Sequence, residues 1–246
     1  MAGTKLNTMH EAFFREIGEA VETLSVDASV HCILIWSDRR VFSAGLDLQE
    51  AATSGFAGGP QEDGGELPPA DRARRLYALV KRWQGYLEAI HTCPKPVVVA
   101  CHGASIGGAI DLITAADVRL CSADAYFAIA ETRVAIVADL GTLQRIAKLV
   151  GPGMAREMAF TAENVDAARA LQSGLVNRVY PDKERLLIGA RKMCDGIATH
   201  SPRTVQGTKL VLNYAEDHNL QDALDHVALY NASFLDGPDL QEVRSF

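Results

Sequence analysis

Short apolar segments alternate with segments of helical periodicity in the first half of this chain, and this alternation constrains the fold more than any other feature. Residues 30–36 and 97–101 are apolar runs rich in β-forming residues, which predicts strands buried on both faces. Between them, apolar residues recur at three- and four-residue spacing over 71–91, which predicts a long helix. Strands that alternate with helices are typical of an α/β core with parallel strands.

The remaining patterns predict a core in the first half and mainly helices in the second. The predicted helices cover 8–24, 142–150, 152–160, 166–173, 182–199 and 219–235, and the further predicted strands cover 117–121, 125–129 and 175–179. Residues 51–70 are rich in glycine, proline and acidic residues, so we expect a loop that borders a site or serves as a plain linker.

Composition excludes several classes of function. The chain has 24 basic and 31 acidic residues among 246, and a formal charge of −7 argues against a general nucleic-acid surface. The five cysteines include no CxxC pair, so we expect reduced core thiols and neither a structural zinc site nor another metal site. No apolar run approaches the roughly 18 residues of a membrane span, and the first residues show no secretory or transit leader.

Three acidic residues stand in apolar sequence where core residues are expected. Glu131 and Asp139 flank the apolar run of ETRVAIVADLGT, and Asp111 lies among alanine, isoleucine and leucine. Each has a plainer interpretation: Asp111 as a favourable charge in the first turn of a helix, Glu131 as a strand-end surface residue, and Asp139 as a helix N-cap. Buried carboxyl groups, however, have raised pKa values, which suits them for general acid and base catalysis.

Two glycine turns could bring the backbone close to a ligand. The first, VFSAGLDL, turns at Gly45, and Asp47 could simply cap the turn. The second, GASIGGAID, runs from a strand into a helix and offers free N–H groups to an anion. Its spacing fits neither a dinucleotide fingerprint nor a P-loop, and close packing of helix and strand would also explain it.

Together these motifs resemble the enoyl-CoA hydratase/isomerase (crotonase) superfamily. FSAGLDL, HGASIGGAIDL and the acids that follow carry the resemblance, and AIVADLGTLQR is most similar to the Δ3,5-Δ2,4-dienoyl-CoA isomerase branch. The resemblance implies an α/β fold of the crotonase (ClpP-like) type, a spiral of ββα units with a C-terminal helical trimerisation region. We therefore expect a core over 1–180, an oligomerisation region over 181–246, and a homotrimer or homohexamer.

The resemblance also implies residue roles. The N–H groups of Leu46 and Gly108 would bind the thioester oxygen of an acyl-CoA. The residues implied to bind substrate are Ala44, Gly45, Leu46, Asp47, Leu48 and Gly108. Glu131 would take a proton from C2 of a 3,5-dienoyl-CoA, Asp139 would deliver one to C6, and Asp111 would orient or tune the other two. The CoA thioester would be the substrate, so no further cofactor is expected.

Other functions remain open for a chain of this kind. A 2-enoyl-CoA hydratase needs only two acids, for which Asp111 and Glu131 would serve, and it has no need of Asp139. A non-catalytic crotonase-fold protein could bind RNA or a protein partner, or act as an inactive scaffold, although the acidic charge disfavours RNA. The resemblance implies fatty-acid β-oxidation in the mitochondrial or peroxisomal matrix. Arg39, Arg40, Lys95 and the arginines of 72–75 are candidates to meet the CoA phosphates.

Overall fold

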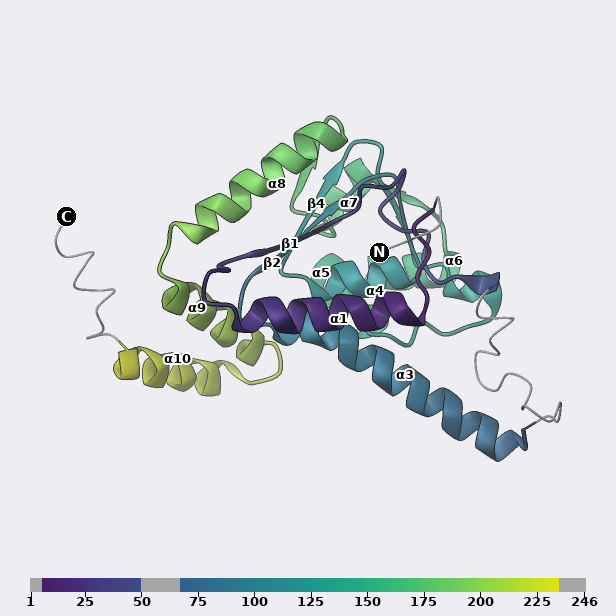
Figure 1. Cartoon of the computed structure of the whole chain (residues 1–246), viewed down its shortest axis with the longest axis horizontal. Helices are drawn as coiled ribbons and strands as arrows, with labels where there is room; N and C mark the ends of the chain where they lie inside the picture. The colour runs from purple at the N-terminus through teal and green to yellow at the C-terminus, as the bar shows by residue number, and fades with distance from the viewer. Residues whose placement is uncertain (1–5, 50–66, 235–246) are drawn as a thin grey trace.

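The computed structural model describes residues 6–49 and 67–234, and a parallel sheet of four strands lies at its centre (Figure 1). The strands follow the order β1 (Ile33–Trp36), β2 (Val97–Cys101), β4 (Val118–Ser122) and β7 (Arg178–Tyr180). Each neighbouring pair is parallel. The predicted parallel α/β core is therefore confirmed, although the strand predicted over 175–179 begins only at Arg178.

The described chain also forms a second, smaller sheet. It contains β3 (Ala104–Ile106), β5 (Tyr126–Ala128) and β6 (Val165–Asp166) in that order. β3 and β5 are parallel, whereas β5 and β6 are antiparallel. Strand β3 lies inside the segment predicted to be a glycine turn. Its three residues lie between Gly103 and Gly107, and a strand of this length is too short to show a two-residue period in the sequence.

Helices account for most of the remaining described chain. Their bounds are α1 (Glu11–Val26), α3 (Pro69–Thr92), α4 (Gly108–Ala115), α5 (Thr142–Val150), α6 (Pro152–Thr161), α7 (Ala167–Ser173), α8 (Lys183–Ala198), α9 (Pro202–Ala215) and α10 (Leu220–Phe234), with a 3₁₀ turn η1 (Glu131–Val134). The predicted loop over 51–70 lies mostly outside the described residues.

Strand β2 is apolar at every position because side chains pack against both faces of the central sheet. Val97, Val99 and Cys101 belong to the larger hydrophobic cluster, whereas Val98 and Ala100 belong to a smaller one. This alternation follows the two-residue period of a strand. The smaller cluster includes buried residues of α8, which covers one face of the sheet (Figure 1).

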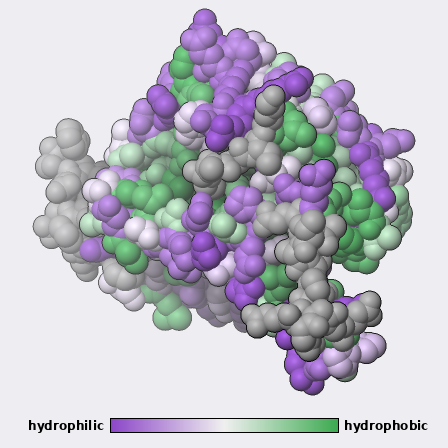
Figure 2. All heavy atoms as spheres, turned by 45° about the vertical axis from the view of Figure 1, so that its right-hand side comes forward, coloured by the Kyte–Doolittle hydropathy of each residue, from purple (hydrophilic) through white to green (hydrophobic). Residues whose placement is uncertain are grey.

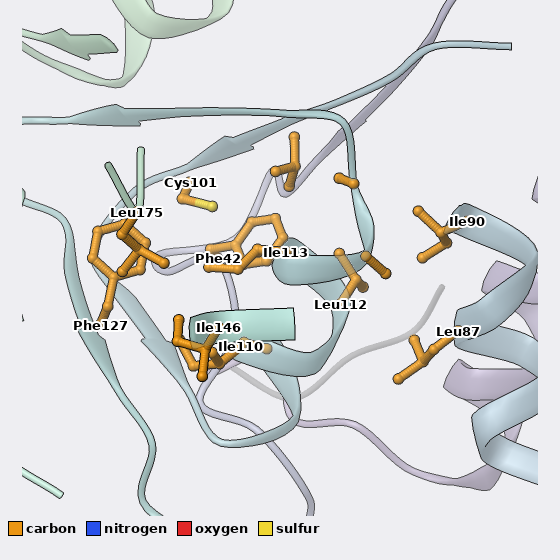
Figure 3. Packing of buried hydrophobic residues seen from close by; sticks show 14 of the residues in the cluster. Phe42, Leu87, Ile90, Cys101, Ile110, Leu112, Ile113, Phe127, Ile146 and Leu175 are labelled. Carbon is orange, nitrogen blue, oxygen red and sulfur yellow. The ribbon is translucent and has the colours of Figure 1, made fainter. Parts of the chain in front are cut away.

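Helix α4 is the centre of the larger cluster. Figure 3 shows Ile110 and Ile113 of this helix between Phe127 on one side and Ile90 of α3 on the other. All eight residues of α4 are buried, including Asp111. Burial of one such aliphatic side chain stabilises the fold by about 1.5–3 kcal/mol. The core thus holds α4, and with it Asp111, in a fixed position.

Besides β3, the two-residue β6 and the late start of β7, two more elements differ from the sequence prediction. Helix α9 was not predicted, because Pro202 and Gly207 interrupt a pattern whose apolar positions are few. In the structure, Pro202 takes the first helical position, where its missing N–H costs nothing, and Ser201 caps the helix. The segment at Glu131 was interpreted as a strand end, but it forms η1.

The domain boundary at 180/181 stays a prediction. Helix α8 lies after it in the chain, yet Leu186 and Ala190 are buried against the central sheet. Among the described helices, none is long and apolar enough to cross a membrane.

Candidate active site

A pocket of about 200 Å³ lies where the two glycine turns, α4, η1 and the turn before α5 meet. Helix α1 contributes Phe14 to its apolar wall, and helix α3 contributes Val80 and Trp83. Leu46, Ile136 and Leu140 of the turns line the same wall. Phe14 and Trp83 stack with ring centroids 4.6 Å apart. The pocket therefore offers a largely apolar surface to any ligand that it admits.

The glycine turns approach each other closely at one side of this pocket. Gly45 has φ +83°, and a Cβ atom placed on it would stand 2.5 Å from the Ile106 carbonyl oxygen and 3.4 Å from the Gly108 nitrogen. Only glycine fits such a position. Leu46 and Gly108 both line the pocket, and within the described residues no protein acceptor takes either N–H group. Two main-chain donors are thus available to a ligand oxygen.

Asp111 is the most buried of the three predicted acids, with 2% of its surface exposed. Its Oδ1 accepts a hydrogen bond of 2.7 Å from the Thr142 N–H, at the first helical residue of α5. Burial raises the pKa of Asp111 to about 7, the Thr142 hydrogen bonds oppose that rise, and the charges of Glu131 and Asp139 add to it. The side chain therefore links α4 to the start of α5.

Glu131 lies half-buried in the pocket wall. Its Oε1 lies 3.3 Å from the place that a Cβ atom on Gly107 would take. Its Oε2 is buried and has no hydrogen-bond partner within the described part of the chain. Burial is the main reason why the pKa of Glu131 is raised, and the charge of Asp139 adds to it. An unpaired carboxylate oxygen in a pocket is available to a substrate proton.

Asp139 lines the same pocket but is exposed to solvent, unlike a residue of the apolar core. Partial burial nevertheless raises the pKa of its carboxyl group. It does not cap α5, which has Gly141 at its N-cap. The carboxyl group that bonds to the first N–H of this helix belongs to Asp111. The plain interpretation of Asp139 as an N-cap is therefore wrong, because the chain turns between Asp139 and the helix.

The structure brings most of the predicted site residues together. The predicted residues that line the pocket are Ala44, Gly45, Leu46, Leu48, Gly108, Asp111, Glu131 and Asp139. Asp47 lies beside this group, outside the lining. Its Oδ2 accepts from the Thr8 hydroxyl at 2.9 Å and its Oδ1 accepts from the Gln49 N–H at 3.1 Å. Its side chain thus stabilises the turn, as the alternative interpretation has it.

One proposed phosphate contact is wrong. Lys95 is only 4% exposed, and its ammonium group donates to the carbonyl oxygens of Leu24 and Asp27. It therefore fixes the end of α1 instead of meeting a ligand.

Sequence reasoning missed the aromatic part of the pocket. Val80 and Trp83 have the spacing of an inward helix face, which predicts core packing, and they do pack there. The same face also lines the pocket, which only the arrangement of α3 against the turn before α5 determines. Arg133 also lines the pocket and donates to the Ala162 carbonyl oxygen, and its sequence surroundings gave no signal of this.

Residues 2–242 match a family model described as enoyl-CoA hydratase/isomerase. A mitochondrial Delta(3,5)-Delta(2,4)-dienoyl-CoA isomerase of Dictyostelium discoideum is 43% identical over 237 residues, which cover 96% of this chain and 78% of that protein. The protein of the same name from Homo sapiens is 40% identical, covering 96% of this chain and 70% of that one. A peroxisomal one from Arabidopsis thaliana is 38% identical, covering 98% and 84%.

Solved structures are similar in fold at lower identity. A putative enoyl-CoA hydratase from Streptomyces coelicolor A3(2) has a TM-score of 0.87 at 24% identity, covering 98% of this chain and 83% of that chain. An enoyl-CoA hydratase from Mycobacterium smegmatis has a TM-score of 0.84 at 25% identity, covering 100% and 89%. These similarities confirm the predicted fold class.

Proposed function

This chain belongs to the enoyl-CoA hydratase/isomerase family, and from that premise we propose that it is an isomerase that converts a 3,5-dienoyl-CoA into the conjugated 2,4-dienoyl-CoA. The observation that carries the proposal is the placement of three carboxyl groups in one pocket with two main-chain N–H groups that donate to no described residue. The relatives reported under this name are 36–43% identical to this chain over nearly its whole length.

The N–H groups of Leu46 and Gly108 would hold the thioester oxygen. Removal of a proton from C2 places negative charge on that oxygen, so donors fixed there bind the transition state better than the ground state. Loss of one such donor costs about 2.7–4 kcal/mol in other enzymes. The close contact between the two turns keeps both donors in place before the substrate arrives.

Glu131 would remove the C2 proton as a carboxylate, and Asp139 would deliver a proton to C6 as a carboxylic acid. The electron pair of the C2–H bond moves along the chain, so that the double bonds shift from C3 and C5 to C2 and C4. One proton leaves and one enters, so no redox cofactor or metal is needed for balance. The raised pKa of Glu131 makes its carboxylate a stronger base, and the raised pKa of Asp139 favours the protonated form that a donor needs.

The exposure of Asp139 has a use in this scheme. After each turnover Glu131 holds a proton and Asp139 lacks one, so both must exchange with solvent. Contact of Asp139 with water provides a route for its reprotonation. Asp111, which is buried, would instead hold the start of α5, and the charges of Glu131 and Asp139 add to the rise of its own pKa.

The chain would act on acyl-CoA in fatty-acid β-oxidation, in a mitochondrial or peroxisomal compartment, as the names of its relatives indicate for them. We also propose a homotrimer or hexamer. Large apolar side chains of α8, α9 and α10 are exposed in the single chain: Ile188, Leu210, Leu212, Leu220, Leu224 and Leu229. On the face that Figure 2 shows, hydrophobic side chains gather in several patches among hydrophilic ones.

A direct assay tests the proposed reaction. The purified chain is incubated separately with a 3,5-dienoyl-CoA and a 2-enoyl-CoA, and the products are separated by chromatography. We expect conversion of the first substrate to the 2,4-dienoyl-CoA at a rate well above hydration of the second. Faster hydration would instead support the hydratase, for which Asp111 and Glu131 share the pocket. If neither acyl-CoA bound to the chain, the result would support a non-catalytic protein.

A further inference from the structure

The turn that carries Asp139 is held by α3, a helix to which the proposed chemistry assigns no part. Gln84 Nε2 of α3 donates a hydrogen bond of 2.6 Å to the Asp139 carbonyl oxygen. The amide oxygen of Gln84 accepts from Lys81 Nζ at 2.8 Å. Because Lys81 can only donate, it fixes the orientation of the amide and turns the NH₂ group toward Asp139.

A second contact holds the same turn two residues later. Arg145 Nη2 of α5 pairs with Glu88 Oε2, one helical turn beyond Gln84 on α3. The guanidinium lies against Gly141: a Cβ atom on that glycine would stand 2.0 Å from Nη1 and 2.9 Å from Cζ. The Arg145 N–H also donates to the Gly141 carbonyl oxygen at 3.1 Å. Gly141 has φ +119°, so the turn has the shape that this close approach needs.

The far end of the turn is fixed by Asp111, whose carboxylate accepts from the Thr142 N–H. The four residues from Asp139 to Thr142 are thus attached to α3 at one end and to α4 at the other. Val80 and Trp83, next to Lys81 and Gln84 on α3, line the pocket itself. The same helix therefore shapes the substrate wall and sets the position of the turn.

We propose that Gln84, assisted by the Glu88–Arg145 ion pair, is a positioning residue that holds the Asp139 carboxyl group within reach of C6 of the acyl chain. This inference rests on the proposed function, since it concerns the second proton transfer. An exposed aspartate on an unsupported turn would sample many positions. Displacement of a reacting group by about 1 Å can cost as much as a hundredfold in rate, so a main-chain tether matters here.

The tether acts through geometry. Neither Lys81 nor Arg145 is among the groups that shift the pKa of Asp139, which is raised chiefly by burial. If the turn moves outward, Asp139 loses that partial burial and its pKa falls toward the ordinary value. Loss of the tether thus has two signatures, one kinetic and one in the titration of a single carboxyl group.

The kinetic test uses Gln84→Met, which keeps the size of the side chain and removes the donor. We expect kcat for 3,5-dienoyl-CoA to fall at least tenfold with KM changed less than twofold. Exchange of the C2 protons with deuterium from D₂O, followed by mass spectrometry, should continue at the wild-type rate, because Glu131 is untouched. Arg145→Met should change turnover in the same direction, and Arg145→Lys, which keeps the ion pair, should restore part of it.

Gln144→Met is the matched control. Gln144 is exposed on α5, and its side chain has no hydrogen bond to any other described residue, so the same chemical change should leave turnover as it is. In an Asp139→Asn background, Gln84→Met should add no further loss. Unchanged kcat in Gln84→Met, an equal fall in C2 exchange, or an additive loss in the double variant would each overturn the proposal.

A titration separates this proposal from the proposed function. Carboxyl ¹³C NMR of the free protein follows the ionisation of Asp139 without any substrate. Gln84→Met should lower the pKa of Asp139 and leave that of Glu131 nearly unchanged, and an unaltered Asp139 titration would contradict the inference. If the wild-type chain turned over no dienoyl-CoA, the proposed function would fail, while the titration would still decide whether Gln84 positions Asp139.

Discussion

At the scale of single residues, the pocket places three carboxyl groups in three different environments. Asp111 is buried and bonded to a backbone N–H, Glu131 is half-buried with one oxygen that no described group bonds, and Asp139 is exposed. Burial raises the pKa of each, and most strongly for Asp111. Groups that differ in this way can divide proton removal, proton delivery and positioning among themselves.

Glu131→Gln and Asp139→Asn should separate the two proton transfers. Loss of a positioned general acid or base costs about 10²–10⁴-fold in rate. We expect Glu131→Gln to lose both C2 exchange and isomerisation, because the first step is blocked. Asp139→Asn should retain C2 exchange and lose isomerisation. Full turnover by Asp139→Asn would remove Asp139 from the mechanism.

The buried carboxyl of Asp111 predicts a pH-dependent stability. Its pKa in the folded state, about 7, lies above the ordinary value of 3.8, so the folded protein binds this proton more tightly than the unfolded chain does. The stability that this group provides is full below pH 4 and is lost as pH rises to about 7. Asp111→Asn keeps an acceptor for the Thr142 N–H without the charge.

Thermal unfolding of Asp111→Asn checks this sign. The variant should match the wild type near pH 4 and exceed its Tm by several degrees at pH 8. A variant that is less stable than the wild type at pH 8 would mean that the ionised carboxylate stabilises the fold through its bond to α5.

At the scale of elements, short turns determine the chemistry and long helices support them. The turns at Gly45 and Gly107 expose main-chain donors, and the turn at Gly141 carries Asp139 past the pocket. Each of these glycines has a positive φ, so a side chain would strain the backbone. Helix α3 packs along α1 (Figure 1), and its residues Val80 and Trp83 line the pocket.

Gly45→Ala should abolish most activity and lower stability. The added Cβ would meet the Ile106 carbonyl oxygen at 2.5 Å, so the turn must move away from Gly108 and the two donors must separate. We expect a loss of at least 10²-fold in kcat and about 1–3 kcal/mol of unfolding free energy. Urea denaturation and the isomerase assay measure both effects.

Gly85→Ala is the control for that substitution. Gly85 lies in α3, and an added Cβ would meet no atom within 4 Å. Alanine favours the helix over glycine by about 0.8–1 kcal/mol, so this variant should gain stability and keep its activity. Equal losses in both variants would show that a Cβ in either place disturbs the fold in general.

At the scale of the whole molecule, the packing on α8 joins the helical second half to the core. Leu186 is fully buried in the cluster between α8 and the central sheet. Leu186→Ala should therefore cost about 2–5 kcal/mol of unfolding free energy, whereas Ile188→Ala, at an exposed position of the same helix, should cost far less in the monomer.

The exposed apolar residues of α9 and α10 predict self-association. Leu212 is 63% exposed and Leu229 is 70% exposed in the single chain. Light scattering coupled to size-exclusion chromatography should give three or six times the mass of 26.5 kDa. Leu212→Glu together with Leu229→Glu should shift the mass toward one chain, because buried unpaired charges are costly. A monomeric wild-type protein would contradict the proposed assembly.

The sequence by itself determined the parallel strands and most of the helices, and it singled out three acids that prove to line one pocket. These depend on local patterns: β2 is apolar at every position because both its faces are covered, and glycines mark the turns because only they tolerate the backbone there. The strands β3 and β6 and the helix α9 were missed because two or three residues, or a helix with proline and glycine, leave no clear period.

Only the tertiary structure decided how each acid behaves. Asp139 is surrounded by apolar residues in the sequence but exposed in space, whereas Asp111 bonds to the Thr142 N–H of a helix 31 positions further along the chain. Likewise, Gln84 gave no signal in the sequence, because its role arises from the contact of α3 with a turn 55 positions away. Burial and partners depend on packing between distant segments, and local periodicity does not encode those distances.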